Sequence, residues 1–156
     1  MPRLLALLPL LLVANTALAR DLGNRLGVGF RAGTGAPPVL SVRYGLPTGN
    51  PAINVQLEAM GGLDLGDLAT DNILVGGRLL YAVVVEDNMN LYAIGGGSLL
   101  SQDGSNGLRL EPALGAEYFP FGVENLGVNG EVGLRMDLGD ALGIGTTAAF
   151  GLTYWF

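Results

Sequence analysis

The sequence predicts an all-β fold: a single eight-stranded antiparallel up-and-down transmembrane β-barrel, preceded by a cleaved signal peptide. Three observations predict it. Apolar residues alternate with small or polar ones in successive segments, which is the two-residue period of a strand. Charged residues keep to the opposite face of these segments. Mean hydropathy is positive, at +0.43, yet no segment after residue 20 reaches the roughly 20 apolar residues of a membrane helix.

The first 19 residues have the features of an export signal. Arg3 supplies a positive charge, residues 4–13 form an apolar stretch interrupted by Pro9, and Ala17-Leu18-Ala19 fits the small-x-small rule for cleavage before Arg20. The alternative, a membrane-anchoring helix, would require about 20 apolar residues. We therefore divide the chain into a signal peptide, residues 1–19, and a barrel domain, residues 20–156.

Eight segments define the predicted strands. The first four are expected at 24–33, 39–46, 52–60 and 72–85, separated by turns at 34–38 and 47–51 and by a longer acidic loop at 61–71. The last four are expected at 90–100, 107–119, 126–137 and 143–156, with turns at 86–88, 102–106, 120–125 and 139–142. A tilted membrane crossing needs strands of about 9–11 residues, and these segments provide that length.

Two of these segments depart from simple alternation. The segment 90–100 is rich in glycine, so the sequence does not distinguish its two faces. Pro112 lies within 107–119, where it has no N–H to donate to the ladder. We expect a bulge or a local break at Pro112.

The distribution of charge predicts which face points inward. Where the two faces are clear, the apolar face carries no Arg, Asp or Glu, and the other face carries both signs in nearly equal number. Arg on a lipid-facing position costs about 2–4 kcal/mol at the bilayer midplane. Since an eight-stranded barrel is only just filled by side chains and unpaired buried charge is costly, we expect a packed lumen charge network; a small conduit is the alternative. The predicted network comprises Arg25, Arg31, Arg43, Glu58, Arg78, Arg109, Glu111, Glu117, Glu131, Arg135 and Asp137.

The tyrosines are expected to gather at one end of the barrel. If the chain starts in the periplasm, four tyrosines fall near the periplasmic ends of downward strands and one near the start of an upward strand. Amphipathic rings favour the membrane interface. The predicted periplasmic aromatic girdle comprises Tyr44, Tyr81, Tyr92, Tyr118 and Tyr154.

The last segment alternates strongly and stops on an aromatic residue: Phe150, Leu152, Tyr154 and Phe156 share one face. It resembles the assembly signal that the barrel-assembly machinery reads in bacterial outer-membrane proteins. With Gly115-Ala116-Glu117-Tyr118-Phe119-Pro120-Phe121 and Glu131-Val132-Gly133-Leu134, the chain resembles the small eight-stranded outer-membrane barrels of the OmpA/OmpX type. The resemblance implies location in the bacterial outer membrane. Outer-membrane lipids, lipopolysaccharide and the barrel-assembly machinery are the implied partners, and the implied state is a monomer.

Composition excludes several classes of chemistry. The chain has no Cys and no His, so it forms neither a Ser-His-Asp triad nor a thiolate or imidazole metal site. A net charge of −6 argues against nucleic acid as a partner. Asp64, Asp67 and Asp71 could gather a divalent cation, although solvation is the simpler role, and Gly95-Gly96-Gly97 lacks the Lys and helix of a phosphate loop. We predict no catalytic residue, metal or cofactor.

These observations predict an integral outer-membrane barrel with a structural or interaction role and an interior mostly plugged by side chains. Two alternatives stay open. One is a narrow channel for small solutes, which would conduct ions. The other is a soluble, lipocalin-like barrel that binds an apolar ligand, which would reverse the two faces.

Overall fold

The computed structural model describes residues 21–50, 52–64, 72–102, 105–139 and 142–156. In these ranges no helix is long and apolar enough to cross a membrane. The strands are β1 (Leu26–Gly33), β2 (Ala36–Gly45), β3 (Val55–Asp64), β4 (Asn72–Val85), β5 (Met89–Gln102), β6 (Ser105–Leu110), β7 (Ala113–Tyr118), β8 (Leu126–Leu138) and β9 (Leu142–Trp155).

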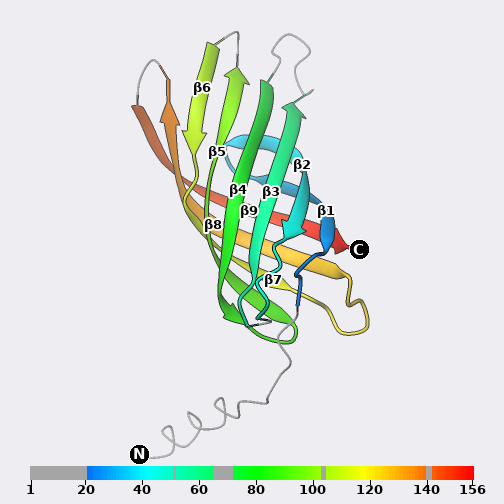
Figure 1. Cartoon of the computed structure of the whole chain (residues 1–156). Helices are drawn as coiled ribbons and strands as arrows, with labels where there is room; N and C mark the ends of the chain where they lie inside the picture. The colour runs from blue at the N-terminus through cyan, green and yellow to red at the C-terminus, as the bar shows by residue number, and fades with distance from the viewer. Residues whose placement is uncertain (1–20, 51, 65–71, 103–104, 140–141) are drawn as a thin grey trace, which may run out of the picture.

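The strands close into a barrel. From β1 to β5 each strand pairs antiparallel with the next, β8 pairs with β9, and β1 pairs with β9 from Gly27↔Trp155 to Gly33↔Ala149. Both β6 and β7 lie between β5 and β8, so they are two parts of one barrel strand. The fold is a closed, eight-stranded antiparallel barrel (Figure 1), which confirms the predicted class.

Pro112 separates β6 from β7, where the sequence predicts a break. Its missing N–H interrupts the ladder, but its carbonyl oxygen accepts a hydrogen bond from Leu134 N at 3.0 Å. Glu111 N, on the other side, donates to Gly96 O at 3.0 Å. The wall therefore stays hydrogen-bonded on both sides of the break.

The first hairpin is tighter than predicted. The expected turn over 34–38 is only Thr34 and Gly35, because Gly33 pairs with Ala36. Pro37 and Pro38 lie inside β2, at an irregularity between the pairs Arg31↔Val39 and Gly33↔Ala36. A bulge tolerates prolines because its extra residue leaves the ladder unpaired.

Apolar side chains point outward and charged ones inward, as the alternation predicts. Leu40 is 69% exposed, and Val132 is 63% exposed, whereas Arg43 is 1% exposed. Apolar clusters flank the charged centre of the interior. Leu22, Phe119 and Trp155 pack together at the end near the carboxyl terminus, Leu80, Ala82, Tyr92 and Ile94 lie beside the charges, and Val39, Met60 and Leu74 lie towards the other end.

Candidate functional site

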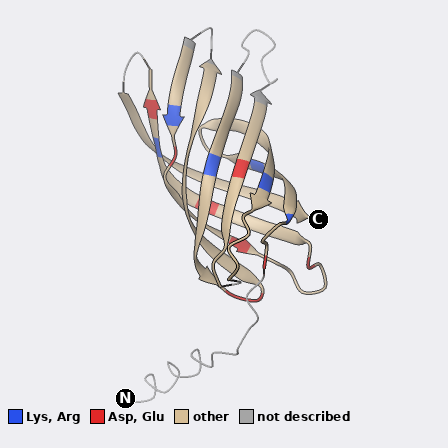
Figure 2. Ribbon diagram, viewed as in Figure 1, with Lys and Arg blue, Asp and Glu red and all other residues tan. Residues whose placement is uncertain are grey.

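The candidate site is the charged centre of the barrel, and Glu131 on β8 is its most connected member. Its carboxylate lies 2.6 Å from Arg78 Nη1, 3.3 Å from Arg31 Nη1 and 3.8 Å from Arg43 Nη2. The three arginines come from β4, β1 and β2. Strands that do not pair with β8 are therefore joined to it through the interior. Figure 2 shows the Arg and Glu positions on the ribbon of several different strands of the barrel.

Two further glutamates complete this centre. Glu58 on β3 accepts hydrogen bonds from Arg43 Nε at 3.0 Å and from Arg78 Nε at 2.7 Å. Glu117 on β7 lies 3.6 Å from Arg43 Nη1 and accepts a hydrogen bond from Trp155 Nε1 at 3.1 Å. Each of these carboxylates therefore has a positively charged group beside it in the interior.

The signs balance among the buried charges. The buried arginines are Arg31, Arg43, Arg78 and Arg109, and the buried glutamates are Glu58, Glu111, Glu117 and Glu131. Glu111 lies 3.7 Å from Arg31. Buried ions are tolerated when they are paired, and the guanidinium offers five donors in a planar fork that suits several carboxylates at once. The arrangement fills and cross-links the interior.

A second, smaller ionic group lies farther from the carboxyl terminus. Arg109 Nε donates to Asp137 Oδ1 at 2.5 Å, and Arg135 Nε lies 3.6 Å from the other oxygen of the same carboxylate. Both arginines also donate to the carbonyl oxygen of Gly35, at 2.7 and 3.1 Å. The β1–β2 turn is thereby tied to β6 and β8 through the interior.

Arg25, a predicted member of the lumen network, lies elsewhere. It precedes β1 and donates to Asn125 Oδ1 at 2.7 Å and to the carbonyl oxygens of Trp155 and Phe156. The prediction extended the alternation of β1 past its first residue, Leu26. At the end of the barrel, Arg25 holds the end of β9 in place through these hydrogen bonds.

The predicted place of Tyr92 in the girdle is also wrong. Tyr92 is 2% exposed, its hydroxyl donates to Glu117 Oε2 at 3.3 Å, and Gln56 Nε2 donates to that hydroxyl. Gln56 and Trp155 are interior residues outside the predicted network. A signal for Tyr92 exists, since it shares its strand face with Asn90 and Ser98, which are both buried.

The other predicted aromatic residues point outward. Tyr44, Tyr81, Tyr118 and Tyr154 are between 39% and 49% exposed, and each lies towards the end of its strand nearest the termini. Phe150 and Leu152 share the outward face of β9 with Tyr154, and Phe156, which follows the strand, is also exposed, whereas Trp155 is fully buried. The assembly role of this face stays a prediction.

Some predicted features lie outside the described residues. They include the signal peptide, Asp67, Asp71 and the side chain of Asp64. Within the described ranges, no group of three or more His, Cys, Asp or Glu residues is arranged to hold a metal ion.

No protein-family model matches the sequence, and no curated protein matches it. Solved structures do. The N-terminal β-barrel domain of Pseudomonas aeruginosa OprF superposes with a TM-score of 0.60 at 13% identity, over 86% of this chain and 98% of that one. The chain has the fold of the small eight-stranded outer-membrane barrels. A designed transmembrane β-barrel (TM-score 0.49, 17% identity, 88% of this chain and 99% of that one) and Ail of Yersinia pestis (0.41, 15%, 85% and 94%) are also similar.

Proposed function

We propose that this chain is an integral protein of the bacterial outer membrane whose interior is closed by side chains, and that it serves a structural or interaction role rather than carrying solutes. The observation that supports this most directly is the division of its residues between the two faces of one closed sheet. Exposed Leu, Val, Ile and Phe side chains surround the barrel, and paired Arg and Glu side chains occupy the centre.

The outward face supports the membrane location. Burying apolar area is favourable by about 25 cal/mol per Å², so a water-soluble protein would not leave this many large apolar residues exposed. A closed barrel satisfies its backbone hydrogen bonds without a free edge, which is what a bilayer requires of strands. A lipocalin-like barrel would need the opposite arrangement, with an apolar interior open to a ligand.

The interior supports a closed barrel. Arg78, Arg43, Glu58 and Glu131 meet at the centre: Arg78 pairs with Glu58 and lies 2.6 Å from Glu131, and Arg43 lies 3.0 Å from Glu58. Leu22, Phe119 and Trp155 cover the centre on one side, and Val39, Met60 and Leu74 cover it on the other. A conduit would have to separate these pairs and displace apolar groups.

Two measurements test the proposal. Cell fractionation with heat-modifiable gel migration should place folded protein in the outer membrane. Purified, refolded protein in planar bilayers should show no stable single-channel steps. Recovery of folded protein from the soluble periplasmic fraction would overturn the location, and regular steps with the wild-type chain would overturn the closed interior.

A further inference from the structure

The wall of the barrel is interrupted where the first hairpin is shorter than its neighbours. Pairing between β2 and β3 ends at Val39↔Gly62, while β3 and β4 continue pairing to Asp64↔Asn72. The sequence explains where the pairing stops: Pro37 and Pro38 precede Val39 and have no N–H. Because successive N–H positions of a strand point to opposite neighbours, one of the two prolines deprives β3 of a donor. The two strands therefore separate towards the end of the barrel that lies away from the termini.

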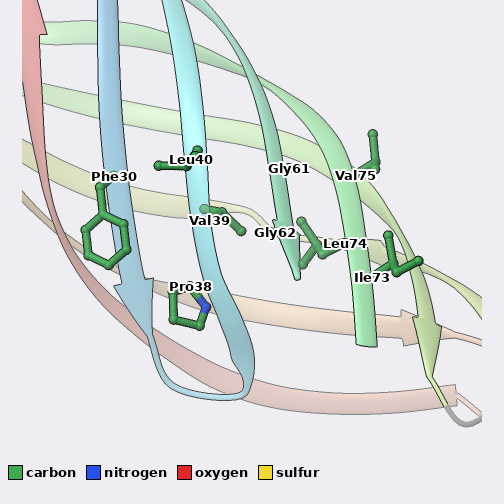
Figure 3. A pocket seen from close by; sticks show the side chains of 9 residues that line it. All are labelled: Phe30, Pro38, Val39, Leu40, Gly61, Gly62, Ile73, Leu74 and Val75. Carbon is green, nitrogen blue, oxygen red and sulfur yellow. The ribbon is translucent and has the colours of Figure 1, made fainter. Parts of the chain in front are cut away.

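An apolar cleft of about 460 Å³ lies at this separation, within the size range of ligand sites, which is about 300–1,000 Å³. Phe30 and Leu40 border it on one side, and Ile73 and Val75 on the other (Figure 3). None of its lining residues carries a charged or hydrogen-bonding side chain. Its walls are thus continuous with the outward apolar face of the barrel.

The floor of the cleft belongs to the interior. Val39 and Leu74 line it and are 2% and 0% exposed, since they pack with Met60 inside the barrel. Gly61 leaves space in the cleft: a Cβ built there would meet only Leu74 O, at 3.9 Å. Gly62 differs, because its Cβ would lie 2.5 Å from Pro38 O. The cleft is a groove that enters the wall, formed by the strand separation and the missing side chain of Gly61.

We propose that this β2–β3 cleft binds one acyl chain of a membrane lipid, which lies over Gly61 between Leu40 and Val75. The inference rests on the proposed membrane location. An acyl chain is narrow, flexible and wholly apolar, so it matches a lining without polar side chains. Surrounding lipids place such chains against the neighbouring outward residues, and the groove adds buried apolar contact to any chain that enters it.

Photolabelling tests this site. Full-length protein is refolded into phosphatidylethanolamine–phosphatidylglycerol vesicles that contain a phospholipid with a diazirine in its acyl chain, and the labelled peptides are mapped by mass spectrometry. We expect labelling of residues 38–40 and 73–75 to exceed that of the outward positions of β8 and β9. Uniform labelling of all outward positions would overturn the proposal.

Two substitutions fill the cleft and one serves as the control. Gly61→Leu places a side chain in the open space, and Val75→Trp covers the cleft from its rim. Gly95→Leu adds the same bulk on the outward face of β5, where a Cβ meets nothing within 4 Å and which is not part of the cleft. Both filling variants should reduce labelling at 38–40 to the level found on β8, and Gly95→Leu should leave it unchanged.

The outcomes separate the two proposals. Heat-modifiable migration first shows whether each variant has folded in the vesicles. If the wild type does not insert, the membrane location fails. If the wild type inserts but filling the cleft does not change the labelling, only the acyl-chain site fails. Labelling replaced by cross-linked dimers would mean that a second copy covers the cleft, which also overturns the proposal.

Discussion

Glu131 on β8 and Arg78 on β4 meet inside the barrel, with 2.6 Å between Oε2 and Nη1. Their strands do not pair with each other, so this contact ties together parts of the wall that backbone hydrogen bonds leave separate. Glu131 also lies beside Arg31 and Arg43. It is therefore the carboxylate whose loss would leave the most uncompensated positive charge in the interior.

Replacing Glu131 with Ala should strongly destabilise the barrel. Removing one member of a buried ion pair costs about 3–5 kcal/mol, because the partner charge stays buried without compensation. The free energy of unfolding can be measured by urea titration in vesicles, with gel migration as the readout. Glu86→Ala, at an exposed turn position, is the control and should change stability by less than about 0.5 kcal/mol. Equal stability of the two variants would contradict the central role of Glu131.

Removing a charge-balanced pair should open the interior instead. The double variant Arg78→Ala/Glu131→Ala keeps the net charge and deletes two large side chains at the centre. We expect small conductance steps in planar bilayers from this variant and none from the wild type. The control is Glu86→Ala, which removes a charge at an exposed turn position and leaves the network intact. Identical traces from all three proteins would mean that these side chains do not determine whether the interior conducts.

Tyr92 should contribute to stability through its hydroxyl, in contrast to the outward tyrosines. The hydroxyl receives a hydrogen bond from Gln56 and donates one to Glu117 inside the barrel. Tyr92→Phe removes one hydrogen-bond partner from each of these two buried groups, and an unmade buried hydrogen bond costs about 1–3 kcal/mol. Tyr81→Phe is the control, since the ring of Tyr81 is 49% exposed. The unfolding midpoints of the two variants are compared in the same vesicles. A loss of stability in Tyr81→Phe as large as that in Tyr92→Phe would contradict a special role for the Tyr92 hydroxyl.

The sequence predicted the strands and their inward faces well, because both depend on local alternation. Arg43 and Glu58, for example, stand in register on neighbouring strands, and each is flanked by outward apolar residues. The place of Tyr92 was predicted wrongly, because Gly95, Gly96 and Gly97 carry no side chain that would reveal alternation in β5. The contact between Glu131 and Arg78 depends on how far non-neighbouring strands are shifted along the closed barrel. The local sequence of each strand does not determine that shift.

The turn of the first hairpin is another feature that local sequence did not predict correctly. Thr34 to Pro38 is a run of turn-forming residues, and it predicted a loop. In the structure, a bulge places Pro37 and Pro38 in β2, and the turn itself needs only Thr34 and Gly35. The carbonyl oxygen of Gly35 then reaches Arg109 and Arg135. Contacts from β6 and β8 thus stabilise a turn that local preference alone does not specify.

Gly35 should resist substitution for two separable reasons. Its φ is +72°, which disfavours a side chain, and a Cβ there would lie 1.7 Å from Arg135 Nη1. Gly49 has a φ of +70° with nothing within 4 Å, so Gly49→Ala isolates the backbone cost, about 1–2 kcal/mol. Gly35→Ala should cost more than Gly49→Ala in the free energy of unfolding. This additional loss of stability should shrink when Arg135→Ala is combined with Gly35→Ala. If it persists, the contact with Arg135 is not its cause.

The outward face can be tested with a single charge. Val132 is 63% exposed in the middle of β8, and Phe121 is 85% exposed in the turn that follows β7. If the barrel spans a bilayer, Val132→Arg should cost about 2–4 kcal/mol and Phe121→Arg about 0–1 kcal/mol, because the cost of a cation falls from the midplane to the interface. In a protein surrounded by water, both positions would accept Arg with similar ease. The free energy of unfolding of both variants is measured in phospholipid vesicles, with the wild-type protein as the common reference. Equal stabilities of the two variants would argue against burial of β8 in lipid.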